Sequence, residues 1–147
     1  MHYEILIAMD QTESGACSWL VTVPAFPEVT TDGATQEEGF RHALMAIEEA
    51  IAARIADGED IPAPSRKADT GNFVQVPALT YLKCALYMLA RHEGISNADL
   101  ARRLGWHREQ VDRLFRIDHN SQLGQLEAAF KEIGHPLSFE TSFPAAA

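Results

Sequence analysis

Residues 96–115 contain two short amphipathic patterns separated by a glycine, and this feature constrains the fold more than any other. Ser96 followed three residues later by Asp99 is typical of a helix N-terminus, because the two side chains can bond each other's backbone amides. Gly105 permits the left-handed backbone of a tight turn. Each predicted helix has an apolar stripe: Leu100, Ala101 and Leu104, then Val111, Leu114 and Phe115. The pattern predicts a helix-turn-helix, whose second helix meets the major groove of DNA.

The polar positions of this helix pair carry the predicted DNA contacts: Asn97, Arg103, His107, Arg108, Glu109, Gln110 and Arg113. The guanidinium group of Arg108 can hydrogen-bond the edge of a guanine, and the side-chain amide of Gln110 can hydrogen-bond the edge of an adenine. Asn97, Arg103 and Arg113 are better suited to phosphates. Each arginine could instead be a solvated charge paired with a neighbouring acid. Because such readers usually bind DNA as symmetric dimers, we expect a homodimer or a higher homo-oligomer.

The net charge of −9 is divided unevenly along the chain. Residues 1–65 carry two basic and twelve acidic residues, a net charge of −10, whereas residues 66–147 carry ten basic and nine acidic residues, a net charge of +1. Phosphate repels an acidic surface and a basic protein attracts it. The second part is therefore the predicted nucleic-acid face, and the first part is suited to a cationic protein partner.

The 147 residues suffice for one ordinary domain or two small ones of a globular protein. We find no apolar run of about 18 residues that could span a bilayer, and no signal-peptide pattern at the N-terminus. We therefore expect a cytosolic protein with no membrane partner.

The cysteines and histidines do not form a pattern typical of a metal site. Cys17 and Cys84 are far apart in apolar surroundings, so we expect both to be small buried side chains. The six histidines are scattered without a close His-His pair. His107 is the one that we weigh further, because at the start of the second helix it could meet DNA, cap the helix or stay solvated. We expect neither a metal nor another cofactor.

The first 58 residues change from a period of two to a helical period. Residues 3–10 and 17–23 alternate in polarity and flank a turn-like segment, which predicts a β-hairpin. A short third strand is predicted at residues 29–33, after two prolines. Thr35 and Glu38 then form a capping-box pattern that opens a helix ending at Gly58. These elements predict a small antiparallel sheet with one covering helix.

The second part of the chain is predicted to be helical. Residues 66–78 contain turn formers and a possible last strand at 73–76, so we interpret them as a linker. Apolar stripes predict helices at residues 81–92 and 121–133 on either side of the helix-turn-helix, giving about four helices. Beyond them Leu137, Phe139 and Phe143 alternate with polar residues, as in a strand that pairs with another copy or in a frayed tail.

The order of these parts resembles the HicB antitoxin family. The resemblance rests on the hairpin and on three segments: Val23-Pro24-Ala25-Phe26-Pro27, Thr31-Asp32-Gly33-Ala34-Thr35-Gln36-Glu37-Glu38 and Gly58-Glu59-Asp60-Ile61-Pro62-Ala63-Pro64-Ser65. It implies an α+β protein with a truncated RNase H-like domain at residues 1–65 and an all-α helix-turn-helix domain of the Cro and repressor type at 79–147. It further implies an antitoxin that occludes a small basic RNA-cleaving toxin, HicA, and represses its own operon at operator DNA.

The toxin would meet the exposed face of the sheet and its rim, where we select the candidate contacts Asp10, Glu13, Trp19, Phe26 and Glu28. Acids would speed association, and a buried aromatic anchor would supply more of the affinity.

Two other functions remain open from the sequence. One is a ligand-sensing transcriptional repressor without a toxin partner, and the other is an RNA-cleaving enzyme. Metal-dependent cleavage needs several carboxylates converging on two Mg²⁺ ions, and only Asp10 is suggestively placed. We therefore expect no catalytic residues.

Overall fold

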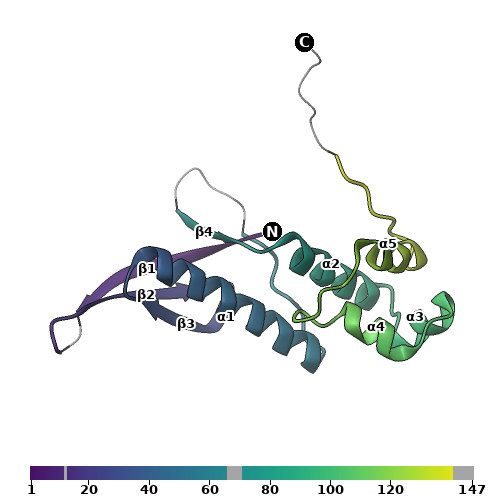
Figure 1. Ribbon diagram of the computed structural model, residues 1–147, viewed down its shortest axis with the longest axis horizontal. Helices are drawn as coiled ribbons and strands as arrows, with labels where there is room; N and C mark the ends of the chain where they lie inside the picture. The colour runs from purple at the N-terminus through teal and green to yellow at the C-terminus, as the bar shows by residue number, and fades with distance from the viewer. Residues whose placement is uncertain (12, 66–70, 141–147) are drawn as a thin grey trace, which may run out of the picture.

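The computed structural model describes residues 1–11, 13–65 and 71–140. The molecule is elongated, with a sheet at one end and a group of short helices at the other (Figure 1). Helix α1 (Gln36–Asp57) lies along the sheet and points toward the helical end. The fold is a mixed α+β arrangement, as the sequence predicted.

The sheet has four antiparallel strands in the order β3-β2-β1-β4. The strands are β1 (His2–Gln11), β2 (Cys17–Val23), β3 (Phe26–Gly33) and β4 (Asn72–Gln75). The predicted hairpin and the last strand are confirmed. Strand β3 begins three residues earlier than predicted and includes Pro27, which an edge strand tolerates because one side of its backbone needs no ladder bonds.

The two faces of the sheet differ in burial. Helix α1 covers the face that carries Tyr3, Ile5 and Val21, which are at most 1% exposed. On the other face Leu6 is 55% and Leu20 38% exposed. Side chains of a strand alternate between faces, so the single helix leaves one face of the sheet uncovered. We call this surface the open face.

Two glycines allow α1 to approach the end of β3. A Cβ atom added at Gly33 would lie 2.4 Å from the backbone nitrogen of Gly39, and one at Gly39 would lie 3.0 Å from Val21 Cγ2. Gly39 is a poor helix former, costing about 1 kcal/mol relative to alanine. Its small size fits this position, because a side chain here would press on Val21 unless that valine shifted.

The caps of α1 agree with the sequence prediction. The Thr35 hydroxyl accepts a hydrogen bond from the Glu38 amide at 3.1 Å, and Glu38 Oε2 accepts one from the Ala34 amide at 2.8 Å. Gly58 ends the helix with φ of +71°, a conformation that favours glycine.

The helical end consists of α2 (Ala78–His92), α3 (Asn97–Leu104), α4 (Arg108–Leu114) and α5 (Leu123–Glu132). The four predicted helices are therefore confirmed. Residues 135–140 form no strand, and Phe143 lies outside the described residues.

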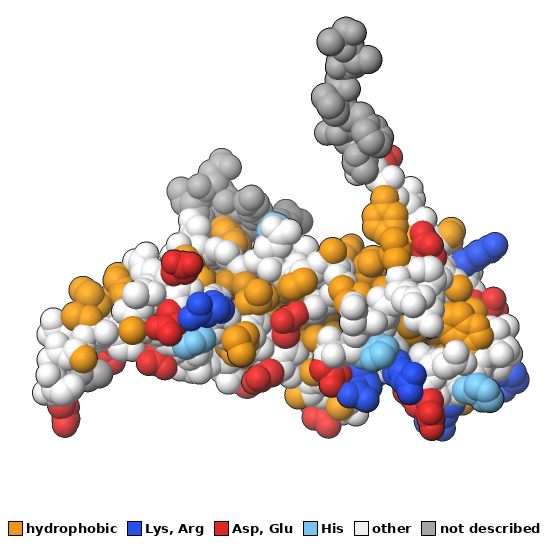
Figure 2. Space-filling view, viewed as in Figure 1, with side chains coloured by type: hydrophobic (Ala, Val, Ile, Leu, Met, Phe, Trp, Pro, Cys, Tyr) orange, Lys and Arg blue, Asp and Glu red, His pale blue; other side chains and the backbone are white. Residues whose placement is uncertain are grey.

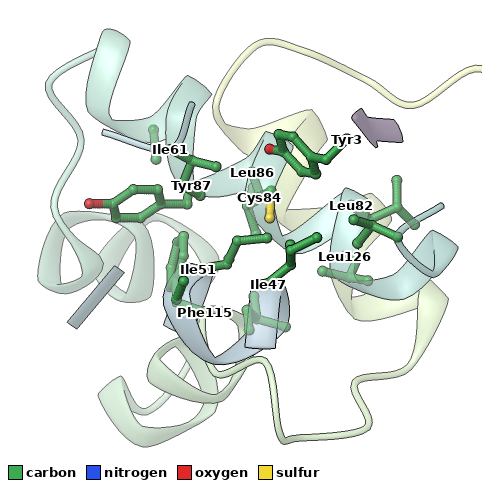
Figure 3. Packing of buried hydrophobic residues seen from close by; sticks show 14 of the residues in the cluster. Tyr3, Ile47, Ile51, Ile61, Leu82, Cys84, Leu86, Tyr87, Phe115 and Leu126 are labelled. Atoms are coloured by element: carbon green, nitrogen blue, oxygen red, sulfur yellow. The ribbon is translucent and has the colours of Figure 1, made fainter. Parts of the chain in front are cut away.

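The buried side chains of both ends form one continuous cluster. In Figure 3, Ile47 and Ile51 of α1 lie near Tyr3 of the sheet and among side chains of the helical end. The helical-end side chains labelled there are Leu82, Cys84, Leu86, Tyr87, Phe115 and Leu126. The sheet end and the helical end are thus packed against each other through α1 and α2.

One prediction about the core is wrong. Cys84 is buried, but Cys17 is exposed at the start of β2. The apolar alternation around Cys17 does not imply burial because α1 does not extend over this tip of the hairpin (Figure 1).

Candidate functional site

Helices α3 and α4 are positioned by local caps. The Ser96 hydroxyl accepts a hydrogen bond from the Asp99 amide at 3.1 Å and donates one to Asp99 Oδ2 at 2.7 Å. This bond, with help from Arg102, holds the pKa of the Asp99 carboxyl below its usual value. Gly105 ends α3 with φ of +67°, which turns the chain toward α4.

Side-chain amides fix the start of α4 and its angle to α3. The His107 backbone N–H donates to Gln110 Oε1 at 3.0 Å, and Asn97 Nδ2 donates to Asp112 Oδ1 at 2.8 Å. Asn97 therefore braces the two helices, and Gln110 caps α4 with its oxygen. The exposed side chain of Gln110 keeps its amide nitrogen, a hydrogen-bond donor, for another partner.

The predicted contacts Arg103, Arg108 and Arg113 are all exposed on this helix pair. Arg108 is 72% exposed, and its Nε atom lies 3.8 Å from Asp112 Oδ2, a loose pair that water screens. His107 and Glu109 are also exposed. Figure 2 shows Lys and Arg side chains gathered at the helical end, with acidic side chains between them.

Lys83 of α2 supports the end of α4 from inside the protein. It is fully buried, and its ammonium group donates to the backbone carbonyls of Arg113, at 3.2 Å, and of Arg116 and His119. Burial lowers the pKa of Lys83 below its ordinary value. The carbonyls at a helix C-terminus carry partial negative charge, so a cation is well placed there.

The sequence reasoning missed Lys83, although a signal was present. Lys83 follows Leu79 by four residues and precedes Leu86 by three, so it lies on an apolar stripe of the helix. A single lysine on such a stripe indicates a buried ammonium that needs acceptors from another element.

Helix α2 is also hydrogen-bonded to the sheet end. Thr80 Oγ1 donates to Glu48 Oε1 of α1, and the Tyr87 hydroxyl donates to the Glu59 carbonyl at 2.7 Å. Helix α2 therefore connects α1 with the segment that holds α4.

The predicted toxin contacts do not lie on one surface. Asp10 is exposed on the open face, and Glu13 is exposed in the turn that follows. Trp19 is half-buried and lies opposite Met9, on the other face of the sheet. Glu28 is exposed but accepts a hydrogen bond from Arg54 Nε at 2.9 Å.

The prediction that Phe26 is an exposed contact is wrong. Phe26 is 0% exposed, and its ring packs edge-on against Tyr3 with the centroids 4.9 Å apart. The guanidinium of Arg54 lies 5.5 Å from the Phe26 centroid and covers it. The turn at residues 24–25 places Phe26 at the start of β3, with its ring in the core.

Three further features bear on function. In the described ranges no three His, Cys, Asp or Glu side chains are arranged to hold a metal ion. An apolar cavity of about 230 Å³ lies between α2 and the segment after α1, and Tyr81, Cys84 and Met88 contribute to its lining. No helix of the described residues has the length and apolar character to cross a membrane.

Comparison with known proteins gives consistent matches along most of the chain. Residues 2–85 match the family described as HicB_like antitoxin of bacterial toxin-antitoxin system. Antitoxin HicB of Pseudomonas fluorescens (strain Pf0-1) is 34% identical, over 86% of this chain and 87% of the relative. Antitoxin HicB 2 of Photorhabdus laumondii is 31% identical, over 93% of this chain and 94% of the relative. Antitoxin HicB of Escherichia coli (strain K12) is 30% identical, over 82% of this chain and 87% of the relative.

Proposed function

The chain belongs to the HicB-like antitoxin family of bacterial toxin-antitoxin systems, and from this premise we propose how its two ends divide the work. The sheet end binds and neutralises a HicA-type mRNA-cleaving toxin. The helical end binds operator DNA and represses the antitoxin's own operon. The observation that carries the proposal is the contrast between an acidic sheet end with an uncovered face and a helix pair that exposes arginines.

The fold supports two finer assignments within this proposal. The three strands β3-β2-β1 with a single covering helix support a truncated RNase H-like unit at residues 1–65, and β4, from the segment interpreted as a linker, adds a fourth strand to its sheet. Helices α3 and α4 with the Gly105 turn support a helix-turn-helix of the Cro and repressor type within residues 79–147. We place both activities in the cytosol and propose that the antitoxin binds its operator as a homodimer or a higher oligomer.

In the DNA complex α4 lies in the major groove. Arg108 and Gln110 contact base edges, because a guanidinium fork and an amide match guanine and adenine. Arg103 and Arg113 contact phosphates, and His107 and Glu109 line the same exposed surface. Asn97 acts mainly by bracing α3 against α4, given its bond to Asp112.

The DNA proposal is tested with Arg108→Ala and the matched control Arg41→Ala. Arg41 is exposed on α1, so its removal changes the net charge equally without touching α4. Fluorescence anisotropy with the antitoxin's own promoter should show about a tenfold to hundredfold loss for Arg108→Ala, the scale of one bidentate base contact. Arg41→Ala should bind like the wild type. Wild-type protein that ignores the promoter at low salt would refute repression by this chain.

The toxin proposal assigns Asp10 and Glu13 to steering a basic surface and Trp19 to a contact at the sheet tip. Glu28 contributes less, because Arg54 already neutralises it. Asp10→Lys combined with Glu13→Lys should slow toxin association by about tenfold at low salt, with little change in dissociation. The matched control reverses Glu127 and Glu132, two exposed acids of α5. Equal association rates for both double variants would contradict the assignment.

The cavity bears on the alternative, a ligand-sensing repressor. Its volume is about 230 Å³, and a more open hollow of about 500 Å³ is lined by Asp60, Met88, Arg91 and His92, so volume alone does not separate the two functions. The antitoxin function is better supported because the family matches extend over most of the chain. Co-expression with a neighbouring small basic protein should restore growth and give a stable complex, an outcome that a ligand sensor does not predict.

A further inference from the structure

Strand β1 is paired on only part of one side. Strand β4 pairs with its first residues, from His2 opposite Gln75 to Ile5 opposite Asn72. On its other side β1 pairs with β2 from Leu6 to Gln11. Within the described parts of the chain, no strand continues β4 alongside residues 7–11. We call this side of residues 7–11 the open edge of β1.

The hydrogen bonds at the start of β1 show which backbone groups face the open edge. The Met1 carbonyl accepts from the Val76 amide, on the β4 side, whereas the next carbonyl, that of His2, accepts from the Ser65 amide. Successive residues of a strand direct their backbone groups to opposite sides, and the registers of β1 with both neighbours run without a shift. The residues that face the open edge are therefore Ile7, Met9 and Gln11.

The open edge has the chemistry of a docking site. Leu6 is 55% and Met9 59% exposed, so apolar side chains flank the stretch of backbone that no described strand pairs on this side. Native sheets protect edges with charged side chains, above all lysine, with proline or with a bulge. Residues 6–11 contain no lysine, proline or bulge, and their one charged side chain is Asp10, which a basic partner attracts. An edge of this kind pairs readily with an extended segment of another chain.

We propose that the toxin adds an extended basic segment as a strand along the open edge, in continuation of β4. The charge of the first 65 residues, −10, favours a basic segment, and the exposed Asp10 lies beside the added strand. Backbone pairing supplies affinity, and Leu6 and Met9 contact alternate side chains of the segment. This inference rests on the proposed toxin binding and specifies its mode.

The test removes one donor at the open edge. Met9→Pro deletes an N–H that points away from β2, so the β1–β2 ladder keeps its bonds. The control Met9→Ala truncates the same side chain but keeps the N–H. Titrated against a purified HicA-type toxin, Met9→Pro should bind at least about tenfold more weakly than Met9→Ala.

Hydrogen exchange of the unmodified antitoxin gives a second measurement that does not depend on a variant folding. In the free protein the amides of Ile7, Met9 and Gln11 should exchange quickly, while those of Leu6, Ala8 and Asp10 are protected by β2. Bound toxin should slow the exchange of the Ile7, Met9 and Gln11 amides. We call these three amides the first set.

The outcomes separate the inference from the function on which it rests. If wild-type antitoxin binds toxin while Met9→Pro matches Met9→Ala, or while the first set of amides stays unprotected in the complex, the strand-addition mode is overturned and the function stands. If these amides become protected as the antitoxin concentration rises without toxin, the open edge binds a second copy of this chain. That result also overturns the strand-addition mode. Wild-type antitoxin that binds no toxin refutes the proposed function itself.

Discussion

The sheet end and the helical end expose different kinds of surface. The open face carries apolar side chains, and the open edge carries backbone groups that no strand of residues 1–11, 13–65 and 71–140 pairs. The helix pair α3–α4 instead buries its apolar stripe and exposes charged side chains, and capping hydrogen bonds fix the start of each helix. Apolar and backbone contacts depend weakly on salt, and steering by Asp10 and Glu13 adds a moderate salt dependence to toxin binding, whereas contacts to several phosphates weaken steeply as salt rises. Rising salt should therefore weaken operator binding more than toxin binding.

The largest loss of stability is expected from a substitution in the core that joins the sheet end to the helical end. Ile47 of α1 is fully buried in the shared core, so Ile47→Ala should lower the free energy of unfolding by about 3–4 kcal/mol. Because the core is continuous, both ends should lose stability together. Urea unfolding followed by fluorescence of single-tryptophan variants checks this, since Trp19 reports on the sheet end and Trp106 on the helical end.

The control for this prediction is Met45→Ala, two residues earlier on the same helix. Met45 is 55% exposed, so its loss should change stability by less than about 0.5 kcal/mol. Two separate transitions for Trp19 and Trp106 in the wild type would show that the ends unfold independently.

A smaller loss of stability is expected for Lys83→Met, because Lys83 supports only the helical end. Three carbonyls lose their donor, while the cost of burying an ammonium disappears. The net loss should be about 2–3 kcal/mol. Operator affinity should fall more than toxin affinity, because Lys83 holds the end of α4. An equal loss of both would indicate a general effect on folding.

Ser96→Ala should have a still smaller effect, limited to the start of α3. Loss of the N-cap hydroxyl should cost about 1 kcal/mol, measured by urea unfolding. Ser96→Asp, another good cap, should restore most of the loss. A value near zero would show that tertiary packing alone fixes α3.

The pH dependence of this cap is the smallest expected effect. Asp99 has a lowered pKa in the folded protein, so its contribution is present above the unfolded pKa and is lost as pH falls through the folded value. Ser96 is the main cause of that shift. The stability difference between wild type and Ser96→Ala should therefore be larger at about pH 7 than at about pH 3. A constant difference would contradict this assignment.

The elements predicted best from the sequence are those that depend on near neighbours. The caps at Thr35, Ser96 and Gly105 bond residues only three or four positions away, and each was predicted. The exposure of Arg108 likewise follows from helical periodicity. Within the candidate DNA site, the bracing role of Asn97 required the structure, because it depends on the angle between two helices, and so did the capping role of Gln110.

The elements that the sequence did not predict depend on distant contacts. Phe26 is buried because Tyr3 and Arg54 enclose it, and Cys17 is exposed because α1 ends short of the hairpin tip. Lys83 needs carbonyls about thirty residues away. The open edge follows from the short length of β4 rather than from any motif in β1.

The core that joins α1, α2 and the strands has a consequence for recombination among family members. A chimera that takes its toxin-binding half from one antitoxin and its operator-binding half from another would place foreign side chains against Ile47 and Ile51. Helix α2 has partners on both sides of such a joint, since Thr80 bonds Glu48 of α1 and Lys83 bonds carbonyls at the end of α4. A crossover before or after α2 therefore separates one set of partners, and hybrids should express well only when the side chains packed across the new joint are exchanged together.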